Sequence, residues 1–519
     1  MHDQDDGALV LTQDETTVVA GGRRETFLRR ARLPLLLFLA GLVGFALPAW
    51  DRILEPSPHF HFVDLAHSFL QGRLDTDTPR RRRGATARPD DPPGLQAAVD
   101  RHLMDGGRPT GFNDWASYRI LTLTGGEEVR GVFPWKDERG SRANHFRTLG
   151  GDEMVIDLNV DLARVCEESP RRSCDRTRYF VSFPPFPAVV MLPLVMIWNY
   201  HLNDVLLTVV LAALNLTLMF LLLETLRARG WSARSRRDNV LLALLFAFGT
   251  VHYFSAVRGE VWFTALILGV TLHTGYVWAA LDTRRPLVAA ALLAAAMATR
   301  TPLAFGAVFF GLQLCFPGGS FKNSSLSHKL KQGTLFALPL VAVGVALMLY
   351  NQARFESPFE FGHRYLLEGT RASIRDHGLF SWHFLNQNLS AAITNMPRLS
   401  NVPPFFQITR HGLGIFVVTP FFLYLLWPER TGWDRTARFR HLVLWISVAC
   451  VTVPALLYQN TGWEQFGYRF SLDWTPYMMV LLAMGRRKLT RGALVVLALS
   501  VAINLFGAIT FTRFPALYY

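Results

Sequence analysis

Charged residues are scarce in this chain. Only 18% of its 519 residues are Asp, Glu, Lys or Arg, against roughly 25% in an average soluble protein. Several windows lack them entirely, among them Leu33–Trp50, Val240–Val257 and Leu335–Gln352. Each approaches the ~20 residues that a helix needs to cross a hydrocarbon core about 30 Å thick. The sequence therefore predicts a polytopic membrane protein and excludes a soluble enzyme.

Cysteines and cofactor motifs are also few. Four cysteines cannot build a disulfide framework. Cys166 and Cys174 share one long polar stretch, where an oxidising compartment would favour a disulfide and two free thiols are the alternative. The sequence contains no P-loop, dinucleotide fingerprint or zinc-ligand spacing. No metal site is predicted, the cofactor is unknown, and a divalent cation stays an open alternative.

The basic residues are abundant but clustered. The net charge of +13 would suggest a nucleic-acid partner in a soluble chain. Here most basic residues lie in short clusters between apolar segments, a pattern typical of the cytoplasmic loops of a membrane protein. No nucleic-acid partner is therefore predicted. Five arginines from Arg23 to Arg32 precede the first apolar run and place the N-terminus in the cytoplasm. Arg greatly outnumbers Lys, a bias typical of GC-rich bacterial genomes, so the predicted location is a bacterial inner membrane.

Counting the apolar segments gives a topology. A stretch at 186–200, rich in Pro and Trp, is interpreted as a re-entrant or interfacial helix. The region 287–317 fits one long helix or two short helices broken at Arg300–Pro302. Two helices are favoured, because only then do all later basic clusters lie on the same side of the membrane as the N-terminus. The prediction is an all-α protein with about eleven transmembrane helices and an external C-terminus, the segments being 33–50, 203–226, 239–257, 261–281, 287–299, 301–317, 334–351, 412–427, 442–459, 472–487 and 493–512.

These crossings divide the chain into six regions. They are a cytoplasmic tail at 1–32, the first transmembrane helix at 33–50, an extracytoplasmic loop with an interfacial helix at 51–185, a transmembrane bundle at 186–351, a second extracytoplasmic segment at 352–411 and a C-terminal transmembrane bundle at 412–519. Short turns link the other spans, so both large polar regions lie outside. Any chemistry is therefore expected at the outer, extracytoplasmic face.

Four short motifs follow this layout. His61–Leu74 places an aromatic, a Leu-Ala pair and a Gly on a predicted helix beyond the first span, and Phe183–Pro187 is a Pro-Pro segment that begins the return to the membrane. The others are Tyr350–Gly362, with an Asn-x-x-Arg-Phe pattern, and Phe466–Pro476, with a Gly-x-Arg-Phe pattern. In these motifs and in layout the chain resembles the GT-C superfamily of polyprenyl-phosphate-sugar-dependent glycosyltransferases, in its uncharacterised bacterial branch.

The resemblance implies transfer of a hexosyl or pentosyl group from a polyprenyl-phosphate sugar donor, within membrane lipid, to a glycan, lipid or protein acceptor. Where the superfamily usually has its acidic residue, seven or eight positions before Ala66, this chain has Pro58 and His59. One alternative is therefore a non-catalytic relative that binds lipid-linked glycan. Another is a transporter or flippase of lipid-linked intermediates, although the two halves show no repeat.

A base is sought on the predicted helix 62–71. Phe62, Leu65, Ala66 and Phe69 recur at helical spacing on one face, while Asp64, His67, Ser68 and Gln71 share another. Such a helix lies flat at the interface, where partial desolvation raises a carboxylate pKa toward values useful for a base. Asp64 is the predicted base with His67 beside it; a solvated polar stripe is the alternative. His59 is assigned to substrate binding.

Arginines are the candidates for holding a lipid phosphate, because their planar fork binds two oxygens. Arg469 lies in a predicted external turn, with pairing to Glu464 or Asp473 as its alternative role. Trp463, in the same turn, is the one aromatic residue assigned to substrate binding. Arg300 interrupts an apolar run at membrane depth, where ionisable residues are functional candidates by default. Arg364 belongs to the second external segment and is expected to face the acceptor.

Overall fold

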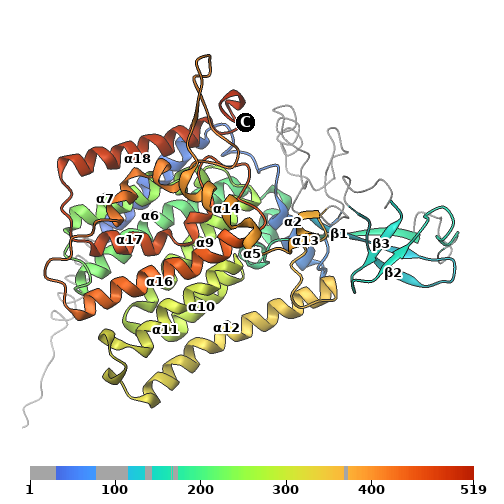
Figure 1. Ribbon diagram of the computed structural model, residues 1–519, viewed down its shortest axis with the longest axis horizontal. Helices are drawn as coiled ribbons and strands as arrows, with labels where there is room; N and C mark the ends of the chain where they lie inside the picture. Colours follow the sequence, from blue (N-terminus) through green and yellow to red (C-terminus); the bar gives the residue numbers. More distant parts are fainter. Residues whose placement is uncertain (1–30, 78–114, 135–142, 165, 167–173, 367–371) are drawn as a thin grey trace, which may run out of the picture.

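Long apolar helices dominate the described chain. The computed structural model describes residues 31–77, 115–134, 143–164, 166, 174–366 and 372–519, so most of the predicted tail at 1–32 lies outside them. Within this part, six helices are long and apolar enough to cross a membrane. Figure 1 shows them running side by side through the bundle. They are Ala31–Ala49, α6 (Asp204–Ala228), α9 (Val261–Ala280), α12 (Leu326–Phe355), α16 (Arg435–Leu457) and α18 (Arg491–Thr510).

The predicted count of about eleven spans is not confirmed, because several predicted segments form short or broken helices. The segment 239–257 divides at Gly249 and Thr250, and 412–427 divides before Pro420, whose ring cannot continue a helix. The shorter elements are α5 (Phe186–Trp198), α7 (Arg236–Phe248), α8 (Val251–Ala256), α10 (Pro286–Met297), α11 (Ala307–Cys315), α15 (Ile415–Val418), η11 (Pro420–Leu425), η12 (Arg469–Asp473) and α17 (Thr475–Met484).

The predicted break at Arg300–Pro302 does occur. Between α10 and α11 the chain passes through a 3₁₀ turn, η6 (Thr301–Gly306), and reverses direction. As a result Gln313 returns beside Asp282, whose backbone N–H donates to the Gln313 Oε1 at 3.1 Å. The turn therefore lies at one end of the bundle and Asp282 at the other.

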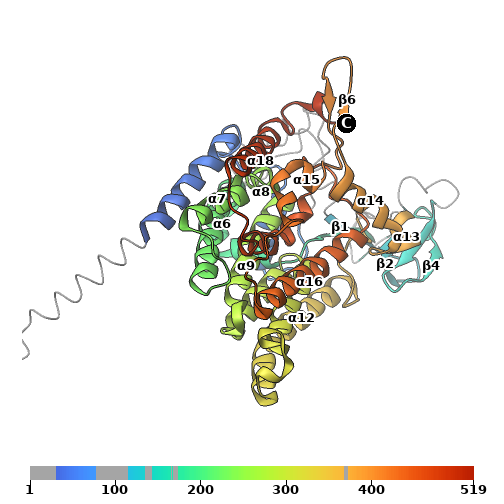
Figure 2. The same cartoon turned by 60° about the vertical axis from the view of Figure 1, so that its left-hand side comes forward.

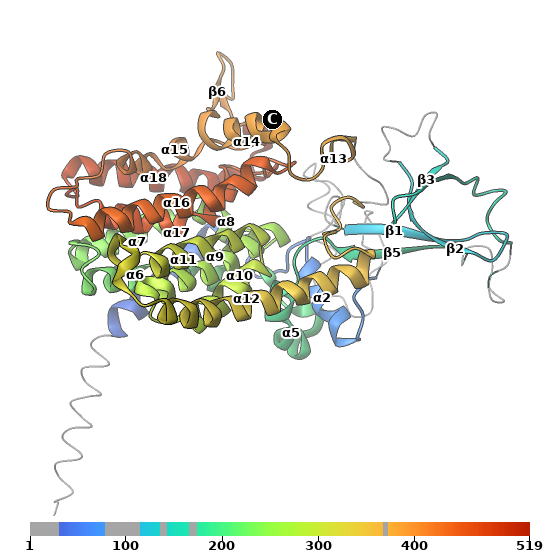
Figure 3. The same ribbon diagram turned by 60° about the horizontal axis from the view of Figure 1, so that its bottom comes forward.

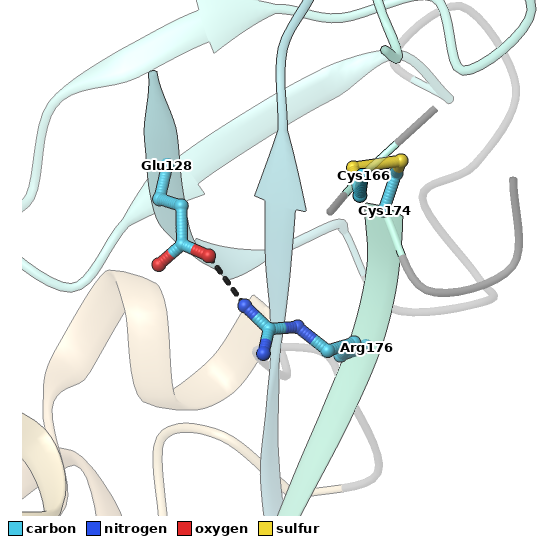
Figure 4. The surroundings of a disulfide bond; sticks show 4 residues. All are labelled: Glu128, Cys166, Cys174 and Arg176. Carbon is cyan, nitrogen blue, oxygen red and sulfur yellow. Dashed lines mark hydrogen bonds and ion pairs between the residues drawn. A yellow bond between two sulfur atoms is a disulfide. The ribbon is translucent and has the colours of Figure 1, made fainter. Parts of the chain in front are cut away.

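The prediction of an all-α protein is wrong within residues 51–185, where an antiparallel five-stranded sheet forms. Strand β1 pairs with β2 and β5, with Ile120 opposite both Arg130 and Arg176. Figure 4 shows the Arg176–Glu128 ion pair on this sheet, and the disulfide between Cys166 and Cys174. The order is β4-β3-β2-β1-β5, from β1 (Trp115–Thr122), β2 (Glu128–Val132), β3 (His145–Thr148), β4 (Glu153–Val155) and β5 (Asp175–Val181).

The sheet is fixed to one end of the bundle by the end of α12. The Arg354 guanidinium donates to the Val181 carbonyl oxygen at 2.8 Å, and Glu356 pairs with Arg130 of β2 at 2.8 Å. Figure 3 shows α12 running along the bundle toward the sheet. A helix that leaves the bundle in this way holds the sheet against the ends of the spans.

A second attachment runs through helix α2 (His61–Leu70). The predicted apolar face is not at a lipid interface but inside the protein, with Phe62, Leu65 and Ala66 buried and α2 packed against α5. At its start, the His59 ring lies 4.7 Å from the Trp262 ring of α9, and the His61 ring stacks on Trp115 of β1 at 4.5 Å. These rings form a continuous contact from the spans to the sheet.

Basic residues gather at the end of the bundle opposite the sheet. Arg229 and Arg440 both pair with Asp282, at 3.5 and 2.9 Å. The Arg234 guanidinium donates to the Leu482 carbonyl oxygen at 2.9 Å. Arginines that are far apart in the sequence therefore meet at this end. The arginines from Arg23 to Arg30 lie outside the described residues.

Residues 372–414 form a side structure at the sheet end. Figure 2 shows its hairpin projecting from the bundle beside the C-terminus. Its elements are α13 (Ala372–His377), η9 (Trp382–Phe384), α14 (Leu385–Leu389), the π-helical turn η10 (Ser390–Thr394), β6 (Arg398–Leu399) and β7 (Phe406–Gln407).

Candidate active-site cavity

A cavity of about 1300 Å³ opens at the sheet end of the bundle. Turns that are distant in the sequence converge on it, because each follows or precedes a helix that ends at this level. The segment after the first span contributes residues from Asp51 to His59, and the turn before α9 contributes Arg258 to Phe263. The turn η6, which follows α10, and the loop between α16 and η12 also contribute to the wall.

The cavity wall has an apolar part and a charged part. Pro302 and Phe305 of η6 face Val453 and Leu457 of α16 along the apolar part, which lies between helices of the bundle. The charged part carries both signs and is built from turns and helix ends. Its residues are Asp51, Arg52, Glu55, Arg258, Glu260, Arg300, Arg410, Glu464 and Arg469.

Two buried ion pairs fix the orientation of arginines in this wall. Arg258 binds Glu260 through two nitrogens, at 2.9 and 2.6 Å. Arg300 binds both carboxylate oxygens of Asp473 at 2.8 Å each. Bidentate pairs of this kind add geometric specificity to their electrostatic attraction. The sequence predicted a functional role for Arg300 because it lies at membrane depth. In the structure its charge is neutralised by Asp473, which belongs to a different turn.

Arg469 is packed between aromatic rings. Its guanidinium carbon lies 5.0 Å from the centroid of Phe263 and 5.8 Å from that of Phe470. The Nη1 group donates to the Glu464 carbonyl oxygen at 3.4 Å. The carboxylate of Glu464 instead pairs with Arg410 at 3.0 Å. Ring contacts hold the charge of Arg469 at the cavity wall, where the residue is 5% exposed.

The start of α6 holds the first cavity segment in place. The Asp204 carboxylate accepts from the Ser57 N–H at 2.7 Å and from the Ser57 hydroxyl at 2.6 Å. Beside it, the Asn203 amide donates to the Ile53 carbonyl oxygen at 2.8 Å. Sequence reasoning missed this role of Asp204. An Asn-Asp pair ahead of a long apolar run is a signal for a helix start, but it does not identify the distant segment that the acid binds.

Asp51 joins the first and last spans. Its carboxylate forms ion pairs with Arg52 at 3.2 Å and with Arg513, just beyond α18. Burial acts to raise the pKa of Asp51, but the hydrogen bond from Arg513 and the charge of Arg52 outweigh it and hold the pKa well below its usual range. Asp51 is therefore ionised at every pH at which the chain would work.

Four of the predicted site residues line this one cavity. They are His59, Arg300, Trp463 and Arg469. The Trp463 ring also contacts the His411 ring, with centroids 4.7 Å apart. Arg364 is not among the lining residues; its neighbour His363 is, while Arg364 pairs with Glu360 at 3.4 Å.

Asp64 and His67, predicted as the catalytic pair, are not among the lining residues. Asp64 is only 6% exposed within α2. The His67 ring stacks on Tyr200 at 4.5 Å and bonds to Gln71. The polar face of α2 is therefore largely packed against protein. Among the cavity carboxylates, sequence reasoning overlooked Glu55, three positions before Pro58.

The chemistry that this cavity offers is recognition of an anion with an apolar tail. Arginines at the wall suit phosphate oxygens, and the part between η6 and α16 suits hydrocarbon. Within the described residues, no group of three or more His, Cys, Asp or Glu side chains is placed to hold a metal ion. No family model, curated protein or solved structure matches the chain.

Proposed function

We propose that this chain is a glycosyltransferase of a bacterial inner membrane that moves a sugar from a polyprenyl-phosphate donor to an extracytoplasmic acceptor. The observation that carries the proposal is the divided wall of the cavity. Its apolar part, with Phe305 and Val453, offers a place for an isoprenoid chain, and its charged part offers Arg469 to a phosphate. A lipid phosphate needs both features at adjoining positions.

The orientation is part of the proposal. The basic clusters meet at the bundle end opposite the cavity, where Arg229 and Arg440 share Asp282. Positively charged turns remain in the cytoplasm. The cavity and the sheet then face the extracytoplasmic side, which also suits the disulfide between Cys166 and Cys174.

The proposed step is a single displacement with inversion. The acceptor hydroxyl oxygen bonds to the anomeric carbon of the sugar as the bond from that carbon to the phosphate oxygen breaks. The electron pair leaves on the polyprenyl phosphate, and the hydroxyl proton goes to a carboxylate. Glu55 is the favoured base because it lines the cavity, whereas Asp64 does not. Arginine at the wall stabilises the departing phosphate.

The test is a sugar-transfer assay on membranes that contain the full chain and a panel of polyprenyl-phosphate sugars. Arg469→Ala is expected to lower transfer on the order of 100-fold, the usual effect of removing a group that stabilises developing charge. Glu55→Gln should abolish it, while Asp64→Asn retains activity if the protein folds. Arg234→Ala is the matched control, because Arg234 is 7% exposed and Arg469 is 5% exposed, and Arg234 donates to the Leu482 carbonyl oxygen at the end opposite the cavity. Full activity of both Arg469→Ala and Glu55→Gln contradicts the site.

One observation favours a second function, binding of a lipid-linked glycan without turnover. The cavity carboxylates Asp51, Glu260 and Glu464 are held in ion pairs with arginine. A carboxylate paired in this way is a poor base, because the neighbouring cation lowers its pKa. A purified chain that binds the donor lipid and never releases polyprenyl phosphate would support this function instead.

A further inference from the structure

A nearly uncharged segment lies beside the cavity. Residues 377–409 contain a single Asp, Glu, Lys or Arg, which is Arg398. Many of their large apolar side chains nevertheless lie at the surface. Soluble surfaces rarely carry a continuous apolar patch of this kind unless it binds something. The most exposed are Trp382 at 74%, Met396 at 66%, Leu399 at 81%, Val402 at 65% and Phe405 at 64%.

The base of this segment is fixed at the level where the last span ends. The Ile408 N–H donates to the Leu517 carbonyl oxygen at 2.7 Å, and the Tyr519 N–H donates to the Ile408 carbonyl oxygen at 3.1 Å. Helix α18 ends at Thr510, a few residues earlier. The hairpin of β6 and β7 therefore starts at the depth at which a bilayer surface would lie.

The hairpin extends sideways from that level. Figures 1 and 3 both show it projecting across the direction of the long helices, whereas the sheet lies beyond their ends. A hairpin with this direction runs along a membrane surface. It does not extend away from the membrane into water.

The helical part of the segment has one face on the protein and one face open. The Asn388 amide donates to the carbonyl oxygens of Leu456 and Tyr458 at 3.1 and 2.6 Å, which ties α14 to the end of α16. Ala391 is buried on the same side, while Leu389 and Ile393 are exposed on the other. The open face continues the apolar surface of the spans.

We propose that residues 380–406 form a lipid anchor that lies in the interfacial layer of the leaflet on the cavity side. Apolar side chains enter the acyl boundary, and Arg398, 6.0 Å from the ring of Tyr519, faces lipid phosphates. Phe380 lines the cavity and bridges to Tyr458, so the anchor holds the cavity mouth at headgroup depth. The inference rests on the helices crossing a bilayer and not on sugar transfer.

The test measures the surroundings of the hairpin tip in the full chain. Cys315→Ser and Cys450→Ser leave only the disulfide cysteines, and Val402→Cys then carries an environment-sensitive fluorophore. The matched control is Val160→Cys in the sheet region, because Val160 is 68% exposed and Val402 is 65% exposed. Both proteins are reconstituted in liposomes of phosphatidylcholine and phosphatidylglycerol. Emission is measured with iodide in the water and with a nitroxide on the lipid headgroup.

The expected result is roughly threefold stronger lipid quenching at position 402 than at position 160, with iodide showing the reverse order. Equal iodide quenching at both positions overturns the proposal, because the hairpin then faces water. Shielding of position 402 from both quenchers also overturns it and indicates a second copy or another protein. Leu399→Cys repeats the measurement on the strand, so that failure of one labelled variant to fold does not decide the outcome.

Discussion

Asp204 holds the cavity segment 51–59 through both of its carboxylate oxygens. Asp204→Ala would leave the Ser57 N–H and hydroxyl buried without this acceptor, so we expect the free energy of unfolding to fall by about 2–3 kcal/mol. Asp204→Asn keeps an acceptor for the N–H and should lose less. Thermal unfolding in detergent micelles compares the three proteins. If the Ala variant unfolds at the wild-type temperature, Asp204 does not hold this segment.

Gly259, between Arg258 and Glu260, adopts a positive φ of +74°, and a Cβ there would lie 2.4 Å from the Val205 Cα. Gly259→Ala therefore combines backbone strain with a clash against α6, and we expect loss of the folded protein or of donor binding. Gly126→Ala is the matched control, because Gly126 has a φ of +82° with nothing within 4 Å of its Cβ. The Gly126→Ala variant therefore has the backbone strain without a clash, which costs about 1–2 kcal/mol. Equal yield and stability of the two variants would contradict a packing role for Gly259.

At the scale of elements, the ring contacts around α2 make its attachment sensitive to acid. Burial lowers the pKa of His61 to about 3, while a hydrogen bond with the His59 backbone acts in the opposite direction. The folded chain keeps His61 neutral, but the unfolded chain binds a proton below pH 6.5. The unfolded state is therefore favoured as the pH falls, by about 2 kcal/mol between pH 6.5 and 5.

The measurement for His61 is the unfolding temperature as a function of pH. His61→Phe keeps a ring against Trp115 and removes the titrating group, so its unfolding temperature should fall less between pH 6.5 and 5 than that of the wild type. Parallel curves for the two proteins would show that protonation of His61 does not contribute.

The long helices were predictable where apolar residues run without a break. The window 334–351 lies within α12, and the windows 203–226 and 493–512 match the bounds of α6 and α18 to within two residues. The sheet was not predictable in the same way. Strand β1 and the edge strand β5 are separated by about 50 residues of sequence and pair through the backbone, and residue periodicity does not reveal a partner at that distance.

The site was predictable where it depends on topology alone. Turns between spans must meet at one face, so Arg300 and Arg469 lie on the same cavity. Asp64 was assigned from helical periodicity, which finds a face and does not say what covers it. Tyr200 and the neighbouring elements cover that face, and for this reason Asp64 and His67 lie away from the cavity wall.

At the scale of the whole molecule, the gathering of arginines at one end predicts an orientation. A phosphatase that folds only outside the cytoplasm should be active when fused after Tyr519 and inactive when fused after Lys322, which lies among the basic clusters of the opposite end. The reverse pattern would place the cavity on the cytoplasmic side and remove the basis for an extracytoplasmic acceptor.

The central claim is that the divided cavity takes a polyprenyl-phosphate sugar and transfers its sugar. The most direct test is a mass-spectrometric comparison of lipid-linked sugars and envelope glycans in cells with and without the protein. The account predicts that cells without it accumulate one polyprenyl-phosphate sugar and lose one sugar from their envelope glycans, and that Glu55→Gln fails to restore either. Unchanged lipid and glycan profiles, or full restoration by Glu55→Gln together with Arg469→Ala, would contradict it.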